Sequence, residues 1–206
     1  MRLHHAILMT AAAIGLGCAA PLHQAHAAEL HVGFTLDPLT MDPANHRSRE
    51  TESVLRVMYD GLVAHDANMQ LVPQLAASWS WPNPTTLEMK LSHGVKFHSG
   101  ATMTADDGVF TFTRLLSKDA IGGKTSPRSG LLGPVTAVEK VDADTIRFVL
   151  SAPWPVLPAM LTFQEVVNKA FTEQQGAEGM ATHKDGTGPY VLDQWRHGDF
   201  DAYWKQ

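Results

Sequence analysis

Two pairs of residues in this sequence have side chains that could do chemistry together. Asp106 and Asp107 form a carboxylate pair, but they follow Thr104 at an expected helix start, where acidic residues stabilise the helix dipole. Adjacent helical positions also point in different directions, so the two carboxylates do not converge on one substrate atom. His93 and His98 flank an expected turn and could share a metal ion, but neither has a second ligand at a recognisable spacing. We therefore interpret the aspartates as a helix start and the histidines as scattered surface residues.

No other catalytic pattern is present in the sequence. There is no G-x-S-x-G elbow, P-loop or H-E-x-x-H motif. One cysteine in 206 residues excludes a disulfide framework and a multi-cysteine zinc site. The sequence therefore predicts no catalytic group, no cofactor and no metal site. Five tryptophans could stack on a sugar or peptide, but we interpret most as core or lobe-interface anchors: Trp79, Trp81, Trp154, Trp195 and Trp204.

Composition places the chain among soluble globular proteins. Apolar residues make up 44% and charged residues 18%, a balance that neither disordered nor collagen-like chains show. Sixteen Lys and Arg stand against 21 Asp and Glu, giving a formal charge of −5. Because no basic run accompanies this acidic balance, nucleic-acid binding is not expected.

Residues 1–27 have the three parts of a secretory signal peptide. Arg2 supplies a positive charge, Ala6–Ala20 is apolar, and Ala25–Ala27 is a small-residue exit, so we expect cleavage after Ala27. A membrane anchor is the alternative, but the apolar run of about fifteen residues is short of the roughly twenty that a spanning helix needs. Lipid attachment at Cys18 is conceivable, although Gly15 stands where such sites prefer leucine. We expect a soluble protein outside the cytoplasmic membrane.

Hydrophobic periodicity predicts a mixed α/β chain in which antiparallel strands cluster between helices. Ser48 is the expected N-cap of the first helix, and Thr104 that of the second, with Asp107 close to a capping box. We expect loops over 117–132 and 174–186. We also expect that the proline-containing segment 152–158 is not a regular helix and that a helix can begin only after Pro158. The expected helices are 48–63, 104–116 and 160–171, and the expected strands are 30–36, 75–81, 86–91, 95–98, 135–141, 145–150 and 190–195.

Several segments, in order, resemble the family 5 extracellular solute-binding proteins of ABC transporters, which include dipeptide-, oligopeptide- and nickel-binding receptors. The densest match is Leu91–Gly100 with Met103–Asp107, similar to the family's Arg-x-Gly-Val-x-Phe-x-Asp-Gly followed by Thr-Ala-Asp-Asp-Val. Ser99 replaces the Asp of that pattern, and Gly108 replaces its Val. The resemblance covers most of residues 30–204. The other matching segments are Met41–Ala44, Met58–Val63, Val72–Trp79 and Gly186–Leu192.

The resemblance implies a periplasmic binding protein type II-like fold, of which this chain is similar to the N-terminal lobe only. Family members are more than twice as long, so the second lobe is expected to be absent here. By similarity, residues 28–64 and 166–206 belong to the inner sheet of the first lobe, and residues 65–165 to its β-rich side subdomain.

The resemblance also implies a ligand cleft. The loop His46, Arg47, Ser48 and Arg49 faces this cleft by similarity, and Arg128 lies in a second cleft-facing segment. Arg47 and Arg128 could hold a ligand carboxylate through bidentate hydrogen bonds, or they could be ordinary surface arginines.

The expected function is that of the substrate-binding component of an ABC importer, and not that of an enzyme. It would capture peptides or a similar small solute in the periplasm as a monomer and deliver them to the permease and ATPase complex, and this chain would be a truncated copy. A transporter-independent periplasmic binding or chaperone-like module is the alternative. Abundant His and Asp only weakly suggest a third class, an exported hydrolase.

Overall fold

The computed structural model describes residue 32, residues 35–196, residue 198 and the backbone of residues 200–205. The chain divides into two units, residues 1–33 and 34–206, and the elements below all belong to the second unit. The predicted signal peptide, Cys18 and most of the strand expected over 30–36 lie outside the described residues. Val32, Thr35 and Leu36, the described members of that segment, are not in a strand.

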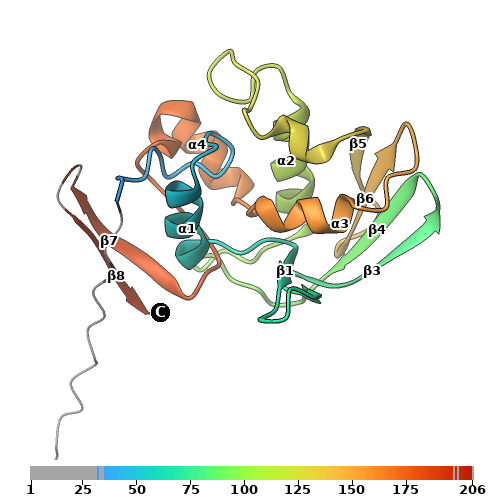
Figure 1. Ribbon diagram of the computed structural model, residues 1–206, viewed down its shortest axis with the longest axis horizontal. Helices are drawn as coiled ribbons and strands as arrows, with labels where there is room; N and C mark the ends of the chain where they lie inside the picture. The colour runs from blue at the N-terminus through green and yellow to red at the C-terminus, as the bar shows by residue number, and fades with distance from the viewer. Residues whose placement is uncertain (1–31, 33–34, 197, 199, 206) are drawn as a thin grey trace, which may run out of the picture. The chain divides into compact units, whose positions relative to one another are not determined.

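The largest sheet in the described residues is antiparallel and has four strands in the order β3-β4-β6-β5 (Figure 1). Side chains of β4 and β6 alternate between buried and less buried positions, the pattern of a sheet with one face on the core. Helix α2 packs on one face, where the rings of Phe112 and Phe148 meet edge to face at 5.1 Å. The helix can approach closely because a Cβ at Gly108 would already lie 3.3 Å from Ile146. The bounds are β3 Ala76–Asn83, β4 Thr86–Leu91, α2 Ala105–Leu116, β5 Val135–Lys140 and β6 Thr145–Leu150.

Helix α1, Arg49–Met58, begins where the sequence predicts and ends earlier. The side chain of Ser48 accepts a hydrogen bond from the Thr51 amide, which confirms Ser48 as the N-cap. The helix stops at Met58, not at Val63, because the Met58 carbonyl accepts the amide of Gly188 at 2.9 Å. A Cβ on Gly188 would lie 2.5 Å from the Met58 carbonyl carbon, so only glycine fits at this approach.

Two strands that the sequence did not predict follow α1. They are β1, Val63–His65, and β2, Leu71–Pro73, which pair antiparallel as a separate two-stranded sheet. The strand expected over 95–98 is wrong, because this segment makes only the isolated bridge between Lys96 and Thr102. The loop expected over 117–132 is interrupted by the 3-10 turn η1, Ser129–Leu132.

The segment after the four-stranded sheet differs most from the sequence prediction. Instead of one helix over 160–171 and a loop over 174–186, the chain forms a short helix, a 3-10 turn and a helix of 12 residues that ends at Met180, so only 181–186 of the expected loop remains. Helix α3 starts just before Pro158, earlier than predicted, because proline is tolerated in a first turn. The amide of Val166 then donates to the Asp60 carbonyl and that of Val167 to Thr111 Oγ1, which interrupts the helix. The bounds are α3 Leu157–Met160, η2 Leu161–Phe163 and α4 Lys169–Met180.

Strand β7, Tyr190–Arg196, is the last strand that the sequence predicts, and it lies beside α1 (Figure 1). It pairs antiparallel with β8, Phe200–Lys205, which the sequence did not predict. No helix in the described part of the chain is long and apolar enough to cross a membrane.

Buried apolar side chains form two separate clusters. The larger lies around the four-stranded sheet and α2 and includes Phe97, Phe112, Leu115, Ile146 and Phe148. Trp79, Trp81 and Trp154 pack against it, and Trp195 packs against the smaller cluster, which confirms these four as core anchors. The smaller cluster draws only on residues from the ranges 28–64 and 166–206: Met41, Val54, Leu55, Met58, Tyr59, Val167, Met180 and Leu192.

Candidate functional site

Four of the five residues that the sequence proposes for ligand binding line one pocket of about 360 Å³. Arg47, Ser48 and Arg49 come from the start of α1, and Arg128 comes from the loop before η1, far along the chain. His46, the fifth, is buried behind the pocket and contacts Arg128. The remaining lining residues are Glu52, Pro127, Gly130, Leu131 and Phe163.

Hydrogen bonds between two distant loops build the pocket. Arg47 Nε donates to the Pro127 carbonyl at 2.6 Å, and Ser126 Oγ donates to the Ala44 carbonyl at 2.5 Å. The same Ser126 oxygen accepts the amide of Arg128 at 3.0 Å. These contacts place the Arg128 side chain against the first turn of α1.

Arg128 is not an ordinary surface arginine, because only 7% of it is exposed. Its Nη2 lies 2.9 Å from Glu52 Oε2, and its Nη1 lies 3.1 Å from His46 Nε2. Glu52 Oε1 also accepts a hydrogen bond from Arg56 Nε at 2.8 Å. Arg128 is therefore held by two partners on one side, while its other side lines the pocket.

A carboxylate lies in the same cluster without hydrogen-bond partners. Glu165 is 2% exposed, and neither of its carboxylate oxygens accepts a hydrogen bond from a described residue. Burial, with the neighbouring Glu52 carboxylate acting in the same direction, raises the pKa of Glu165 to about 8. Burial lowers the pKa of His46 to about 4, with the Arg128 cation acting in the same direction. Both side chains are thus neutral near pH 7.

Sequence reasoning missed both acids of this cluster. Glu52 stands in the first turn of α1, where an acid has a sufficient explanation in the helix dipole. Glu165 is an isolated acidic residue in a mostly apolar segment. It lies near Glu52 in the first turn of α1 because the chain is non-helical between η2 and α4. No spacing in the sequence connects the two positions.

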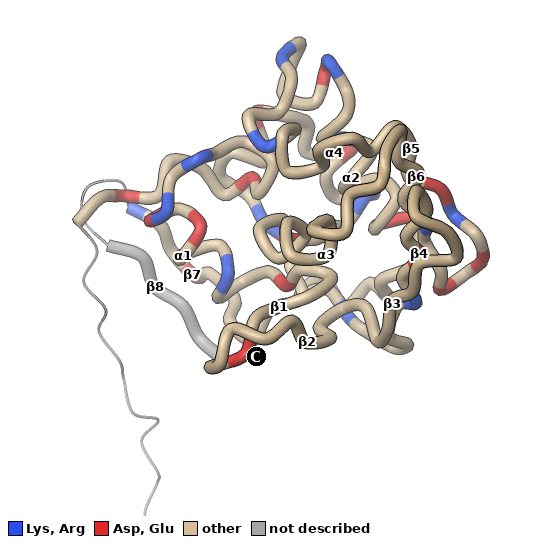
Figure 2. The backbone as a smooth tube through the Cα atoms, turned by 45° about the vertical axis from the view of Figure 1, so that its right-hand side comes forward, with Lys and Arg blue, Asp and Glu red and all other residues tan. Residues whose placement is uncertain are grey.

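The pocket rim is basic. Arg47 and Arg49 are exposed, and neither forms an ion pair with a described acidic residue. Basic and acidic positions follow one another along α1 (Figure 2), but Glu50 and Glu52 are held by Ser48, Arg56 and Arg128. The arrangement leaves guanidinium groups at the rim that can bind a carboxylate in a bidentate manner.

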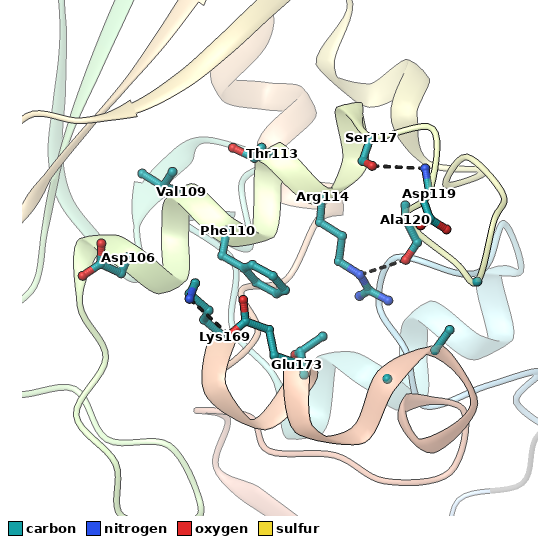
Figure 3. Close-up of a pocket in the computed structure, with 14 residues that line it drawn as sticks. Asp106, Val109, Phe110, Thr113, Arg114, Ser117, Asp119, Ala120, Lys169 and Glu173 are labelled. Carbon is teal, nitrogen blue, oxygen red and sulfur yellow. Dashed lines mark hydrogen bonds and ion pairs between the residues drawn. The ribbon is translucent and has the colours of Figure 1, made fainter.

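A second hollow, of about 570 Å³, lies between α2 and α4 (Figure 3). Its charged side chains are already satisfied: Lys169 pairs with Glu173 at 3.1 Å, and Arg114 donates to the Ala120 carbonyl and pairs with Asp42. This hollow therefore offers less charge to a ligand than the Arg128 pocket does.

The two pairs considered first in the sequence have structural roles. Asp107 Oδ2 accepts the Thr104 amide at 2.9 Å, which confirms the capping box. His93 is exposed and lies 3.4 Å from Asp144 Oδ1, whereas His98 Nε2 contacts the Gly188 carbonyl at 2.8 Å. The two histidines therefore have separate partners.

Comparison with known proteins identifies the family. The profile described as "Bacterial extracellular solute-binding proteins, family 5 Middle" matches residues 70–206, more than half of the chain. The chain belongs to this family. The resemblance proposed from the sequence is thereby confirmed, and the relatives of this family 5 chain are solute-binding proteins and not enzymes.

A curated relative is the glutathione-binding protein GsiB of Pectobacterium atrosepticum, 30% identical over 196 residues. That match covers 91% of this chain and 37% of the relative, so the family 5 chain spans about a third of the relative's length. GsiB of Escherichia coli O1:K1 is 28% identical over 192 residues, covering 91% of this chain and 36% of that protein.

Solved structures confirm the fold class. A dipeptide-binding protein from Pseudoalteromonas sp. SM9913, in complex with Met-Leu, has a TM-score of 0.73 at 23% identity over 82% of this chain and 38% of its own. DppA from Helicobacter pylori, in complex with the peptide STSA, has a TM-score of 0.74 at 25% identity over 83% and 38%. The family 5 chain thus has the fold of part of a periplasmic binding protein.

Proposed function

We propose that this chain forms part of the cleft of an ABC-importer solute receptor and captures a small solute through a carboxylate group. The observation that carries the proposal is the convergence of Arg47, Arg49 and Arg128 on one pocket. Peptides, including a glutathione-like tripeptide, are the favoured solutes, because peptide-binding and glutathione-binding proteins are among the relatives.

The charge distribution supports a carboxylate ligand. Arg47 and Arg49 have no acidic partner among the described residues, so a ligand anion does not have to displace one. Arg128 adds a guanidinium group that is oriented by Glu52 and His46 before any ligand arrives. A guanidinium held in place loses little side-chain entropy on binding, and this preorganisation strengthens binding.

The setting proposed for this receptor is the periplasm. In this proposal, residues 1–27 direct export and are removed by cleavage after Ala27. The receptor then acts as a monomer and delivers its ligand to a permease and ATPase complex. The first-lobe division into 28–64 plus 166–206 and 65–165 is part of the same proposal. The buried residues of the smaller cluster all come from the first pair of ranges, whereas the larger cluster also takes Ala44, Leu62, Val63 and Val166 from them.

Isothermal titration of the chain with matched ligands tests the proposal. We expect heat of binding with glutathione or Met-Leu, and none with Met-Leu whose C-terminal carboxylate is replaced by an amide. The variants R47Q, R49Q and R128Q should each bind more weakly, because each lacks one guanidinium of the pocket.

The matched control is R147Q. Arg147 pairs with Glu88 across β4 and β6, so it is an arginine of the same chain outside the pocket. Equal affinity of the free-acid and amide ligands, or equal losses in R147Q and R128Q, would remove the carboxylate proposal.

A further inference from the structure

We propose that His46, Glu52 and Glu165 form a binding site for a divalent transition-metal ion beneath the Arg128 pocket. One nitrogen or oxygen atom from each of the three side chains lies within 4.8 Å of the other two. This site departs from the sequence-based expectation that the chain has no metal site.

The spacing of the three atoms is close to that of a formed metal site. Metal bonds to imidazole nitrogen and carboxylate oxygen are about 2.0–2.2 Å long, so two ligands of one ion are at most about 4.4 Å apart. His46 Nε2 and Glu52 Oε2 are 3.7 Å apart, within that limit. The bound of 4.8 Å on all three atoms is slightly larger than this limit, so the side chains must draw closer together when an ion binds.

Glu165 is the observation that points to a cation. Its side chain is almost completely buried, yet both oxygens lack a hydrogen-bond donor among the described residues. A buried carboxylate without donors is unfavourable, and natural proteins satisfy such groups by pairing or by metal coordination. The Glu165 backbone is fixed by a bridge to Gly61, so the carboxylate cannot easily turn out to solvent.

The other two side chains are oriented as metal ligands are. His46 Nδ1 lies 3.2 Å from the Ser48 carbonyl, which favours the tautomer with a proton on Nδ1 and a lone pair on Nε2. Arg56 holds Glu52 Oε1, leaving Oε2 for the ion. Partners of this kind fix the direction of the ligating lone pairs.

Arg128 competes with the ion for these ligands. Its guanidinium lies 3.1 Å from His46 Nε2 and 2.9 Å from Glu52 Oε2, so it must move away when the ion binds. The pocket of about 360 Å³ beside it has room for the displaced side chain, and Arg128 Nε makes no hydrogen bond within the described chain that would be lost.

The ligand set selects the class of ion. One imidazole and two carboxylates suit Zn²⁺, Co²⁺, Ni²⁺ and Mn²⁺, whereas Ca²⁺ and Mg²⁺ prefer oxygen ligands only. Three protein ligands leave at least one coordination position open, as in zinc sites that bind an exchangeable molecule.

Titration of the chain with Co²⁺ alone, followed by its visible absorption, tests the site. We expect H46Q, E52Q and E165Q each to lower the Co²⁺ affinity by about tenfold or more, and Zn²⁺ to displace the bound Co²⁺. The control is H183Q, because His183 is an exposed histidine outside this cluster. H183Q should leave the high-affinity absorption unchanged.

Arg128→Gln decides the question even if E165Q fails to fold. Removing the competing guanidinium should raise the Co²⁺ affinity by about tenfold, because one charge and one steric competitor are lost. Unchanged or weaker binding in R128Q, or the same binding curve in E165Q and H183Q, would overturn the site. The ion is measured without any peptide, so this result is independent of the carboxylate proposal.

Discussion

Two arginines are buried in the described part of the chain, and they are satisfied to different degrees. Arg114 in α2 donates from Nη1 and Nη2 to both carboxylate oxygens of Asp42, at 2.8 and 2.6 Å, and from Nε to the Ala120 carbonyl. Arg128 contacts one oxygen of Glu52 through Nη2 and both ring nitrogens of His46 through Nη1, at 3.1 Å from Nε2 and 3.4 Å from Nδ1, and its Nε has no described partner. Both side chains are less than a tenth exposed.

This difference separates a structural pair from a binding site. A bidentate pair in which all three guanidinium nitrogens are engaged has little to gain from a ligand. Figure 3 shows the contact of Arg114 with Ala120 in the loop that follows α2. Arg128 has unused donors, lies beside a neutral buried acid and lines a pocket with two further arginines. The incompletely satisfied cluster is therefore where binding is expected.

The largest effect is expected from breaking the structural pair with Asp42→Asn. Asp42 is completely buried, so the substitution leaves the Arg114 charge without an anion and should lower the free energy of unfolding by about 3–5 kcal/mol. Urea unfolding followed by circular dichroism measures the change. The matched control E88Q breaks the more exposed pair with Arg147 and should have a much smaller effect. Equal losses would contradict the assignment of Arg114 as a structural residue.

Arg128→Gln should cost less stability than Asp42→Asn. Glu52 keeps its hydrogen bond from Arg56 when Arg128 is removed, so no buried charge is left alone, and we expect a loss of about 1–3 kcal/mol. The same urea experiment compares the two variants directly. A loss as large as that of Asp42→Asn would mean that Arg128 is mainly structural, and the binding proposals would lose their central residue.

The sequence predicted features that depend on neighbouring residues better than features that depend on distant contacts. The cap at Thr104 and the strands 86–91, 135–141 and 145–150 depend on neighbours in the chain, and the sequence predicted each of them. The cleft-facing arginines came from family resemblance and lie together in the structure.

Elements that depend on distant contacts could not be predicted. The helix expected over 160–171 is interrupted because Asp60 and Thr111 bind its backbone amides, and no local pattern shows this. Glu165 joins Glu52 and His46 through the same extended segment. Only part of the site was therefore predictable from the sequence. The arginines of its rim were found through family resemblance, whereas its buried acids come together only through tertiary packing.

The free energy of unfolding should depend on pH through Glu165, which belongs to the cluster around Arg128 and not to the Arg114–Asp42 pair. Its pKa is raised from 4.5 to about 8 on folding, so the folded chain keeps a proton that the unfolded chain has lost. The free energy of unfolding should therefore fall as the pH rises between these values, by up to about 1.4 kcal/mol per unit. His46, with its pKa lowered from 6.5 to about 4, acts in the opposite direction below pH 6.5. Of these two groups, Glu165 therefore has the larger effect from pH 6.5 to 8.

Urea unfolding of the chain with a chelator, at several pH values from 6.5 to 8, measures this slope. E165Q should lack the slope because glutamine does not titrate, whereas H46Q should retain it. If the wild-type chain and E165Q change equally over this range, the carboxyl group of Glu165 is not held neutral by burial.

The smallest effect concerns the N-caps of two helices: α1, whose first turn lines the Arg128 pocket, and α2, which carries Arg114 in its last turn. Ser48 caps α1 with one hydrogen bond to the Thr51 amide, and Thr104 caps α2 within a capping box. Ser48→Ala and Thr104→Ala should each lower the free energy of unfolding by about 1 kcal/mol, measured by urea unfolding. Only Ser48→Ala should also weaken binding of a carboxylate ligand, because Ser48 caps α1 between Arg47 and Arg49 and itself lines the pocket. Equal effects of both substitutions on ligand affinity would show that the pocket depends on general stability and not on the local geometry of the α1 start.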